Sequence, residues 1–180
     1  MFNYLFKQIG GQLSSNKSIT TKQKSKLPLQ LFIQYENNEV EPGMNLGQLE
    51  VANQPIVYYP PDIGQGPYTL VVVDPDSPDP KNPIYKEWIQ WMMVNIPKNK
   101  LNQGQTVLPY SSPTPPLGTH RYIFYLYDQM GKVLPPDLTY TRQGFNRSTF
   151  LWKYGIFAAP LAMNYFMVST LNEEGVNLNL

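Results

Sequence analysis

The sequence contains no cysteine, one histidine and few charged residues, which make up 15% of the chain. Without cysteine there is no disulfide, no thiol nucleophile and no cysteine-ligated metal, and the composition suits a reducing compartment, so we expect a cytoplasmic protein. A single histidine argues against zinc, which prefers several nitrogen or sulfur ligands. We therefore predict neither a metal nor a cofactor.

Long apolar runs are also missing. No segment approaches the ~18 apolar residues that a membrane-spanning helix needs. Residues 1–11 lack the continuous apolar stretch and the small-residue cleavage site of a signal peptide, and we expect none. The net charge of +1 gives the chain no general attraction to nucleic acid.

Proline and tyrosine, in contrast, are abundant, with 18 and 13 residues. Proline interrupts helices and occurs at turns and strand edges, so this composition favours an irregular, mostly β fold. Apolar patterning predicts strands over residues 29–35, 54–59, 68–73, 88–96, 121–127 and 160–169. The run 68–73 is apolar throughout and is expected to be a central strand buried on both faces. Beyond residues 1–12, one helix is predicted, with Asn146 as its N-cap and Gly155 directly after its end.

Residues 1–28 differ from the rest of the chain, because they contain five lysines and no acidic residue. Residues 1–12 have apolar side chains at helical spacing, which indicates a short amphipathic helix. Residues 13–26 are polar and basic, as in a flexible tether. We predict a basic N-terminal extension at 1–28, followed by a single domain at 29–180. The extension has two interpretations, a solvated tail or a weak contact with anionic membrane lipid.

Gln90 is a polar residue within an otherwise apolar predicted strand. In a regular strand Trp88, Gln90 and Met92 share one face, while Ile89 and Trp91 share the other. A buried amide needs hydrogen-bond partners. Gln90 is therefore predicted to line a cavity or to join a polar network.

An aspartate-rich turn, residues 74–80, directly follows the predicted central strand. Asp74 and Asp76 in such a place either cap the turn with local hydrogen bonds or take part in chemistry as ligands, acids or bases. His120, the only histidine, follows a proline-rich loop and has the same two interpretations, structural or functional. No GxSxG elbow accompanies it and no nucleophile beside a base is identifiable, so the chain is predicted not to be an enzyme.

Three segments together resemble a known family. They are Asp74-Pro75-Asp76-Ser77-Pro78 with Glu87-Trp88-Ile89-Gln90-Trp91, then Pro115-Pro116-Leu117-Gly118-Thr119-His120-Arg121-Tyr122, and last Phe145-Asn146 with Phe150 and Tyr154. In this order they resemble the phosphatidylethanolamine-binding protein family, which includes Raf kinase inhibitor proteins and plant flowering-time regulators. The spacing of the loop before His120 is similar to that of the plant-type members.

The resemblance implies a large central antiparallel sheet packed against a smaller sheet, with few peripheral helices. It also implies a small pocket where the two signatures meet, which binds phosphate, acetate-like anions or a phospholipid headgroup. The pocket positions that it implies are Asp74, Pro78, Tyr85, Trp88, Gln90, Pro116, Gly118, His120 and Tyr122.

The resemblance also implies a role for several of these side chains. His120 and the hydroxyl of Tyr122 donate hydrogen bonds to an anion. Asp74 orients or protonates His120, or pairs with a ligand ammonium group. The family usually has a second histidine where this chain has Gln90. Because an amide donates a hydrogen bond but cannot become cationic, we expect weaker and less pH-dependent anion binding.

We therefore expect a non-enzymatic binding protein with a small anion or phosphate pocket, which regulates a protein partner. The alternative is an interaction or structural module with a degenerate pocket, in which the basic N-terminal extension makes the functional contact.

Overall fold

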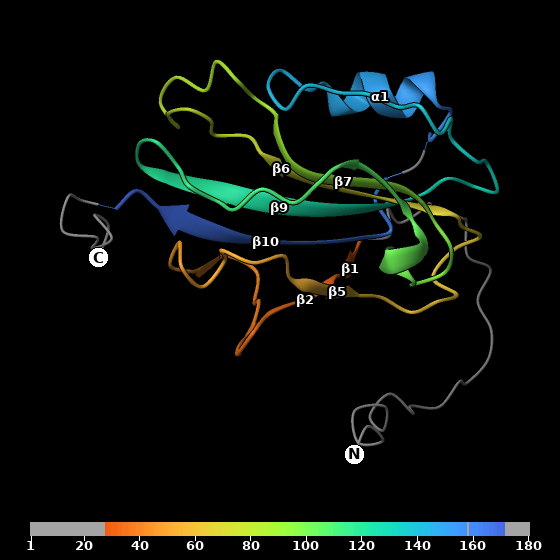
Figure 1. Cartoon of the computed structure of the whole chain (residues 1–180), viewed down its shortest axis with the longest axis horizontal. Coiled ribbons are helices and arrows are strands. Elements are labelled where there is room, and N and C mark those ends of the chain that lie inside the picture. Colours follow the sequence, from red (N-terminus) through yellow and green to blue (C-terminus); the bar gives the residue numbers. More distant parts are fainter. Residues whose placement is uncertain (1–27, 158, 172–180) are drawn as a thin grey trace, which may run out of the picture.

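The chain forms two β-sheets and a covering α-helix, stacked as three layers (Figure 1). The structure, a computed structural model, describes residues 28–157 and 159–171. The strands are β1 Leu29–Gln30, β2 Phe32–Tyr35, β3 Asn38–Glu39, β4 Met44–Asn45, β5 Ile56–Tyr58, β6 Tyr68–Asp74, β7 Trp88–Ile96, β8 Gln105–Leu108, β9 Thr119–Asp128 and β10 Ala162–Ser169. The helix α1 spans Arg147–Lys153, and the 3-10 turn η1 spans Leu101–Gln103. The prediction of a mostly β fold is confirmed.

The large sheet has the strand order β1-β10-β9-β6-β7-β8, with β4 also paired to β10. From β10 to β8 the strands run antiparallel, as predicted. β1 and β4, however, pair with β10 in parallel. The central part of the sheet is therefore antiparallel as predicted, and two short parallel strands make the whole sheet mixed at the β10 edge.

The reason for the mixed edge lies in the path of residues 29–45. β1 and β4 lie along β10, whereas β2 and β3, between them in sequence, belong to the smaller sheet of order β3-β2-β5. The single strand predicted over residues 29–35 is thus divided between the two sheets. Leu31 lies at the division and is fully buried.

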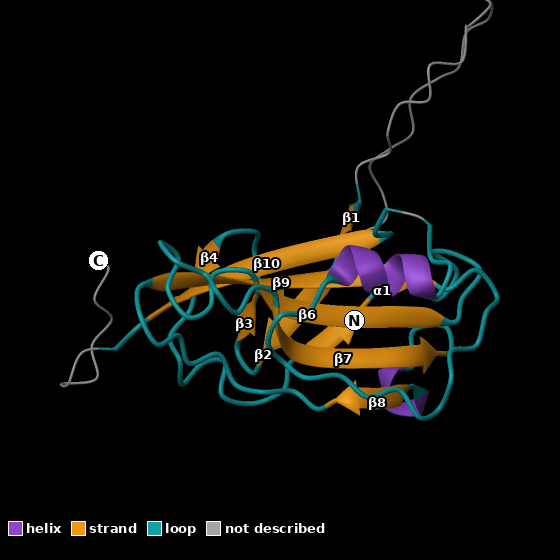
Figure 2. Cartoon of the chain, turned by 90° about the horizontal axis from the view of Figure 1, so that it is seen from above, coloured by secondary structure: helices purple, strands orange, loops and turns teal. Residues whose placement is uncertain are grey.

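The central strand β6 is buried along its whole length, as predicted. Leu70 and Val72 point to the core between the two sheets. Val71 and Val73 point to the opposite core, which α1 covers (Figures 1 and 2). Two-sided burial explains why this segment shows no apolar and polar alternation.

A β-bulge interrupts β7 at Gln90. Val72 pairs with Trp91 and Val73 pairs with Ile89, so Gln90 has no direct partner on β6. Trp91 therefore packs between the sheets, whereas Ile89 packs under α1. The prediction that Ile89 and Trp91 share a face is wrong, because the extra residue shifts the two-residue period.

The predicted helix is confirmed together with its ends. The side chain of Asn146 accepts a hydrogen bond of 2.8 Å from the Thr149 N–H, as an N-cap does. Gly155 follows the end of α1 with a φ of 66°, a conformation that glycine adopts without strain. Phe150 anchors α1 in the core below it.

The helix predicted at residues 1–12 and the tether at 13–26 lie outside the described residues. Within the described ranges, no helix is long and apolar enough to cross a membrane.

Candidate functional site

A cavity of about 210 Å³ opens beside the end of β6, where the aspartate-rich turn begins. It is lined by Asp74, Ser77, Pro78, Tyr85, Trp88, Gln90, Ser111, Ser112, Thr114, Pro116 and Tyr122. These residues come from β6 and its following turn, from β7, from the proline-rich loop and from β9. Segments distant in sequence therefore meet at one place.

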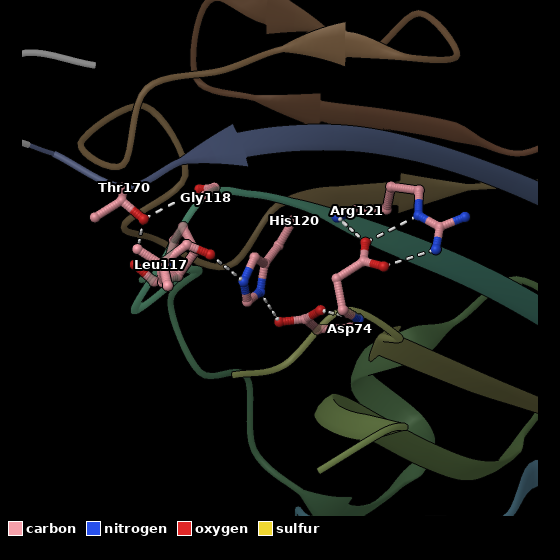
Figure 3. A network of polar contacts seen from close by, with 8 residues as sticks. Asp74, Leu117, Gly118, His120, Arg121 and Thr170 are labelled. Atoms are coloured by element: carbon pink, nitrogen blue, oxygen red, sulfur yellow. Dashed lines mark hydrogen bonds and ion pairs between the residues drawn. The ribbon is translucent and has the colours of Figure 1, made fainter. Parts of the chain in front are cut away.

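Most of the pocket positions expected from the sequence line this cavity, but Gly118 and His120 do not. His120 is fully buried behind the wall. Gly118 lies on the loop, where its carbonyl accepts hydrogen bonds from Thr170 (Figure 3). Both residues thus shape the wall of the cavity from behind.

The strand period explains how the base of the cavity forms. Leu70 and Val72 of β6 face the core between the sheets, and Asp74 continues this face at the strand end. Tyr122 lies on the same side of the neighbouring strand β9, where its ring stacks on Phe166 at 5.5 Å. The bulge in β7 brings Gln90 to the same cavity.

Two contacts of the bulge fix Gln90 in place. Its carbonyl accepts a hydrogen bond of 2.8 Å from the Ser111 N–H. The guanidinium of Arg142 donates to the carbonyls of Ile89 and Gln90 at 2.8 and 3.0 Å, and to that of Pro109 at 2.9 Å. Arg142 therefore ties the bulge to the segment that enters the proline-rich loop.

His120 connects the turn after β6 to the proline-rich loop (Figure 3). Its Nδ1 lies 2.7 Å from the Asp74 carboxylate, and its Nε2 lies 3.0 Å from the Leu117 carbonyl. Burial lowers the pKa of His120, but the hydrogen bond and charge of Asp74 and the Leu117 carbonyl raise it more, so the net direction is upward. A protonated His120 satisfies both acceptors at once.

Asp76 forms a second link between the turn and β9. Its carboxylate accepts hydrogen bonds from Arg121 Nε at 2.9 Å, from Nη2 at 2.7 Å and from the Arg121 backbone N–H at 2.9 Å. Burial raises the pKa of Asp76, but the bonds to Arg121 outweigh it and hold the pKa below its usual value. This bidentate ion pair fixes the position of the turn, and neither Asp76 nor Arg121 lines the cavity.

The base and the mouth of the cavity differ in chemistry. Asp74, Ser77, Gln90 and Tyr122 at the base are each less than 8% exposed. Burial first, and then the Asp74 carboxylate, raise the pKa of Tyr122 far above its ordinary value, so its hydroxyl stays protonated. Among the described residues, the carboxamide oxygen of Gln90 has no hydrogen-bond partner.

The mouth is formed by aromatic rings and hydroxyl groups. Tyr85 and Trp88 pack side by side with ring centroids 6.3 Å apart. From the proline-rich loop, Ser111 and Ser112 are half-buried and Thr114 is exposed. No lysine or arginine of the described chain lines the cavity.

Sequence reasoning missed the hydroxyl groups Ser77, Ser111, Ser112 and Thr114. Ser77 lies within the aspartate-rich turn, and residues 111–114 begin the proline-rich loop. Their proximity to these two segments is the sequence feature that could have indicated that they line the cavity. What the sequence did not reveal is the hydrogen bond from Ser111 to Gln90, which brings the loop to the cavity.

The described residues hold no group of three histidine, cysteine or carboxylate side chains that suits a metal ion. The histidine and carboxylates at this site are paired with each other or with arginine.

Comparisons with known proteins find similar sequences and a similar fold. The family model of phosphatidylethanolamine-binding proteins matches residues 17–166. Protein TWIN SISTER of FT from Arabidopsis thaliana is 39% identical over 139 residues, which are 76% of this chain and 77% of that protein. Protein FLOWERING LOCUS T from the same plant is 33% identical over 154 residues, 84% of this chain and 80% of that protein. The solution structure of CG7054 matches with a TM-score of 0.62 and 31% identity, over 83% of this chain and 89% of that one.

Proposed function

The chain belongs to the phosphatidylethanolamine-binding protein family, and from this premise we propose that it is a non-enzymatic binding protein. Its ligand is a small phosphate-bearing molecule or a phospholipid headgroup, held in the cavity beside β6. The observation that carries this proposal is the cavity itself, in which a buried polar base lies below a mouth of aromatic rings and hydroxyl groups. Pockets with a few convergent polar groups are typical ligand sites.

The hydroxyl groups at the mouth support the phosphate assignment. Ser111 and Thr114 each offer an O–H donor, and phosphate oxygens are strong acceptors. The hydroxyl of Ser112 donates to the Val51 carbonyl at 3.4 Å. Because no lysine or arginine lines the cavity, all hydrogen bonds to the phosphate come from neutral donors. We therefore expect a modest affinity for phosphate.

The environment of His120 supports a binding function rather than catalysis. Both ring nitrogens lie within hydrogen-bond distance of Asp74 and Leu117, and the ring is fully buried. A general base must reach the proton that it removes. His120 does not line the cavity and is occupied on both sides, so it does not activate a hydroxyl there.

The plant relatives bear the names of flowering proteins, and we extend to this chain a regulatory function exerted through a protein partner. The mouth of the cavity has three exposed residues, Tyr85, Thr114 and Pro116. We propose that the partner contacts the surface that they form. Ligand occupancy then changes the surface that the partner meets.

Thermal unfolding with and without phosphoethanolamine or inorganic phosphate tests the proposal, because a ligand of the folded state raises the melting temperature. We expect Thr114→Trp, which places a large ring at the exposed mouth, to remove this rise. Thr106→Trp on the exposed side of β8 is the matched control and should keep it. A wild-type melting temperature that neither compound changes at millimolar concentration contradicts the proposal.

A further inference from the structure

The outer face of the smaller sheet carries exposed apolar side chains. Val57 of β5 points to the core between the sheets, so its neighbours Ile56 and Tyr58 point away from that core. Ile56 is 66% exposed and Tyr58 is 52% exposed. On β2, the half-buried Phe32 lies directly opposite Tyr58. Because opposite residues of neighbouring strands share a face, these three side chains form one apolar patch, on the layer farthest from α1 (Figure 1).

The part of the chain that contains the smaller sheet is acidic. Residues 28–73 include no lysine or arginine and five exposed carboxylates, Glu36, Glu39, Glu41, Glu50 and Asp62. Glu39 of β3 lies opposite Gln34 of β2 and therefore on the same face as the patch. None of the five carboxylates forms an ion pair among the described residues. The outer face thus combines apolar side chains with uncompensated negative charge, which attracts a basic partner.

The segment that precedes this sheet in the sequence has the complementary composition. Residues 1–27 contain no acidic residue and five lysines, Lys7, Lys17, Lys22, Lys24 and Lys26. The apolar side chains of residues 1–12 recur at the spacing of one helix face, at Phe2, Leu5, Phe6 and Ile9. The same segment therefore offers both an apolar face and positive charge.

The chain connects this segment directly to the smaller sheet. The Leu29 N–H in β1 donates to the Leu161 carbonyl at 2.9 Å, and β2 begins three residues later at Phe32. Residues 13–28 span up to about 55 Å when extended, far more than the ~10 Å across three neighbouring strands. Residues 1–12 can therefore reach the patch of their own chain. Such a connection gives an effective concentration in the millimolar range, at which a weak contact suffices.

We propose that residues 1–12 bind to the outer face of the smaller sheet of the same chain. Their apolar side chains contact Ile56 and Tyr58, and the lysines of residues 1–27 lie beside the exposed carboxylates. This contact is independent of the cavity, which lies at the end of β6 in the large sheet. It also withdraws the lysines from anionic lipid, because the same charges cannot pair with both surfaces at once.

Paramagnetic relaxation measured by nuclear magnetic resonance tests this contact. The chain contains no cysteine, so a nitroxide attaches only at an introduced thiol, and Ser15→Cys places it directly after residues 1–12. In the full chain at low salt, the amide signals of β2 and β5 should lose most of their intensity. Those of α1, on the opposite side of the large sheet, should keep theirs. In about 1 M salt, where the Debye length is about 3 Å, the β2 and β5 signals should largely recover.

Two variants of the labelled chain remove the two parts of the contact. Tyr58→Gln removes an exposed apolar ring, and the double variant Glu39→Gln with Glu41→Gln removes two negative charges. Each should restore most of the signal intensity of β2 and β5. The dispersion of the same amide spectra reports that each variant is folded.

Matched controls make the same changes elsewhere. Trp152→Gln removes an exposed ring from α1, and Asp79→Asn with Asp137→Asn removes two negative charges outside residues 28–73. Both controls should show the same loss of β2 and β5 intensity as the labelled chain without them.

Three results would overturn the proposal. The first is intensity of β2 and β5 that the nitroxide leaves unchanged, or a loss confined to α1. The second is a loss that persists in Tyr58→Gln. The third comes from a mixture of nitroxide-labelled chain and nitroxide-free, isotope-labelled chain. If β2 and β5 lose as much intensity in this mixture as in the single labelled chain, the segment binds a second copy and not its own chain.

Discussion

His120, when protonated, donates through both ring nitrogens, to the Asp74 carboxylate and to the Leu117 carbonyl. These two bonds join the end of β6 to the proline-rich loop that forms one wall of the cavity (Figure 3). The sequence left open whether this lone histidine is structural or functional. Because the ring is buried and bonded on both sides, His120 has a structural role: it fixes the proline-rich loop against the end of β6.

The raised pKa of His120 predicts how stability depends on pH. A group whose pKa is higher in the folded than in the unfolded state stabilises the fold fully below its unfolded pKa, here about 6.5, and loses that contribution as the pH rises through the folded pKa. We expect the free energy of unfolding, measured with urea from about pH 5.5 to 8.5, to fall as the pH increases.

The variant His120→Asn should remove this pH slope, since no other histidine exists in the chain. Arg121→Gln, which breaks the neighbouring link to Asp76, is expected to lower stability but to keep the slope. A wild-type free energy of unfolding that is flat or rises over this range would sink the assignment of a protonated His120.

The sequence predicts which residues line the cavity where a motif contains them, and it predicts this less well where side-chain packing determines their position. Asp74, Trp88 and Tyr122 line the cavity as expected from their segments. His120 was expected there too, but sequence spacing does not tell which side of the wall a ring occupies. Whether the carboxamide oxygen of Gln90 finds a partner depends on neighbours that only the folded chain provides.

The bulge in β7 is the element that places Gln90 at the cavity. Arg142 holds it by donating to the carbonyls of Ile89 and Gln90, and so satisfies backbone groups that the interrupted ladder leaves free. Its third bond, to the Pro109 carbonyl, fixes the neighbouring segment. One side chain outside the cavity thus controls the geometry of its base.

Replacement of Arg142 by Met should therefore affect both stability and binding. We expect a loss of about 1–3 kcal/mol in the free energy of unfolding, since charged hydrogen bonds to carbonyls are broken. We also expect weaker binding of phosphoethanolamine, as Gln90 loses its fixed position. Urea unfolding and calorimetric titration measure the two effects.

Arg142→Lys should recover little of either effect, because a single ammonium group does not reach three carbonyls in the geometry of a guanidinium. Lys100→Met, at an exposed lysine, is the control for loss of one positive charge and should change neither quantity beyond about 0.5 kcal/mol. Wild-type affinity in Arg142→Met would show that the bulge does not depend on this residue.

At the scale of elements, strong local signals were predictive. The continuous apolar run gave β6, and the N-cap Asn146 with the following Gly155 gave both ends of α1. The bulge was not predictable, since no local residue pattern marks the position where one extra residue leaves the ladder. The split of residues 29–35 between two sheets likewise depends on pairing with distant strands.

In the whole molecule, the smaller sheet covers one face of the large sheet and α1 covers the other (Figures 1 and 2). The cavity lies where β6 of the large sheet ends, at Asp74. The layered, mostly β architecture was predictable through the family resemblance. The parallel strands at the β10 edge were not, because β1 and β4 are short and carry no signal for direction.

The basic segment at residues 1–28 provides the test of the alternative function. If the cavity is the functional site, deletion of residues 1–26 should leave the affinity for phosphoethanolamine unchanged. If the segment contacts anionic lipid, the same deletion should abolish flotation with vesicles that contain phosphatidylserine, an interaction that high salt also weakens. Partner recovery that is lost on this deletion but survives Thr114→Trp would favour the alternative.

Nuclear magnetic resonance titration with phosphoethanolamine tests most directly whether the cavity beside β6 is a ligand site. We predict saturable shifts of the Gln90 side-chain amide, the Trp88 indole N–H and the backbone amides of Ser111, Ser112 and Thr114, all with one dissociation constant. Saturable shifts confined to another surface, or none at millimolar ligand, would contradict it.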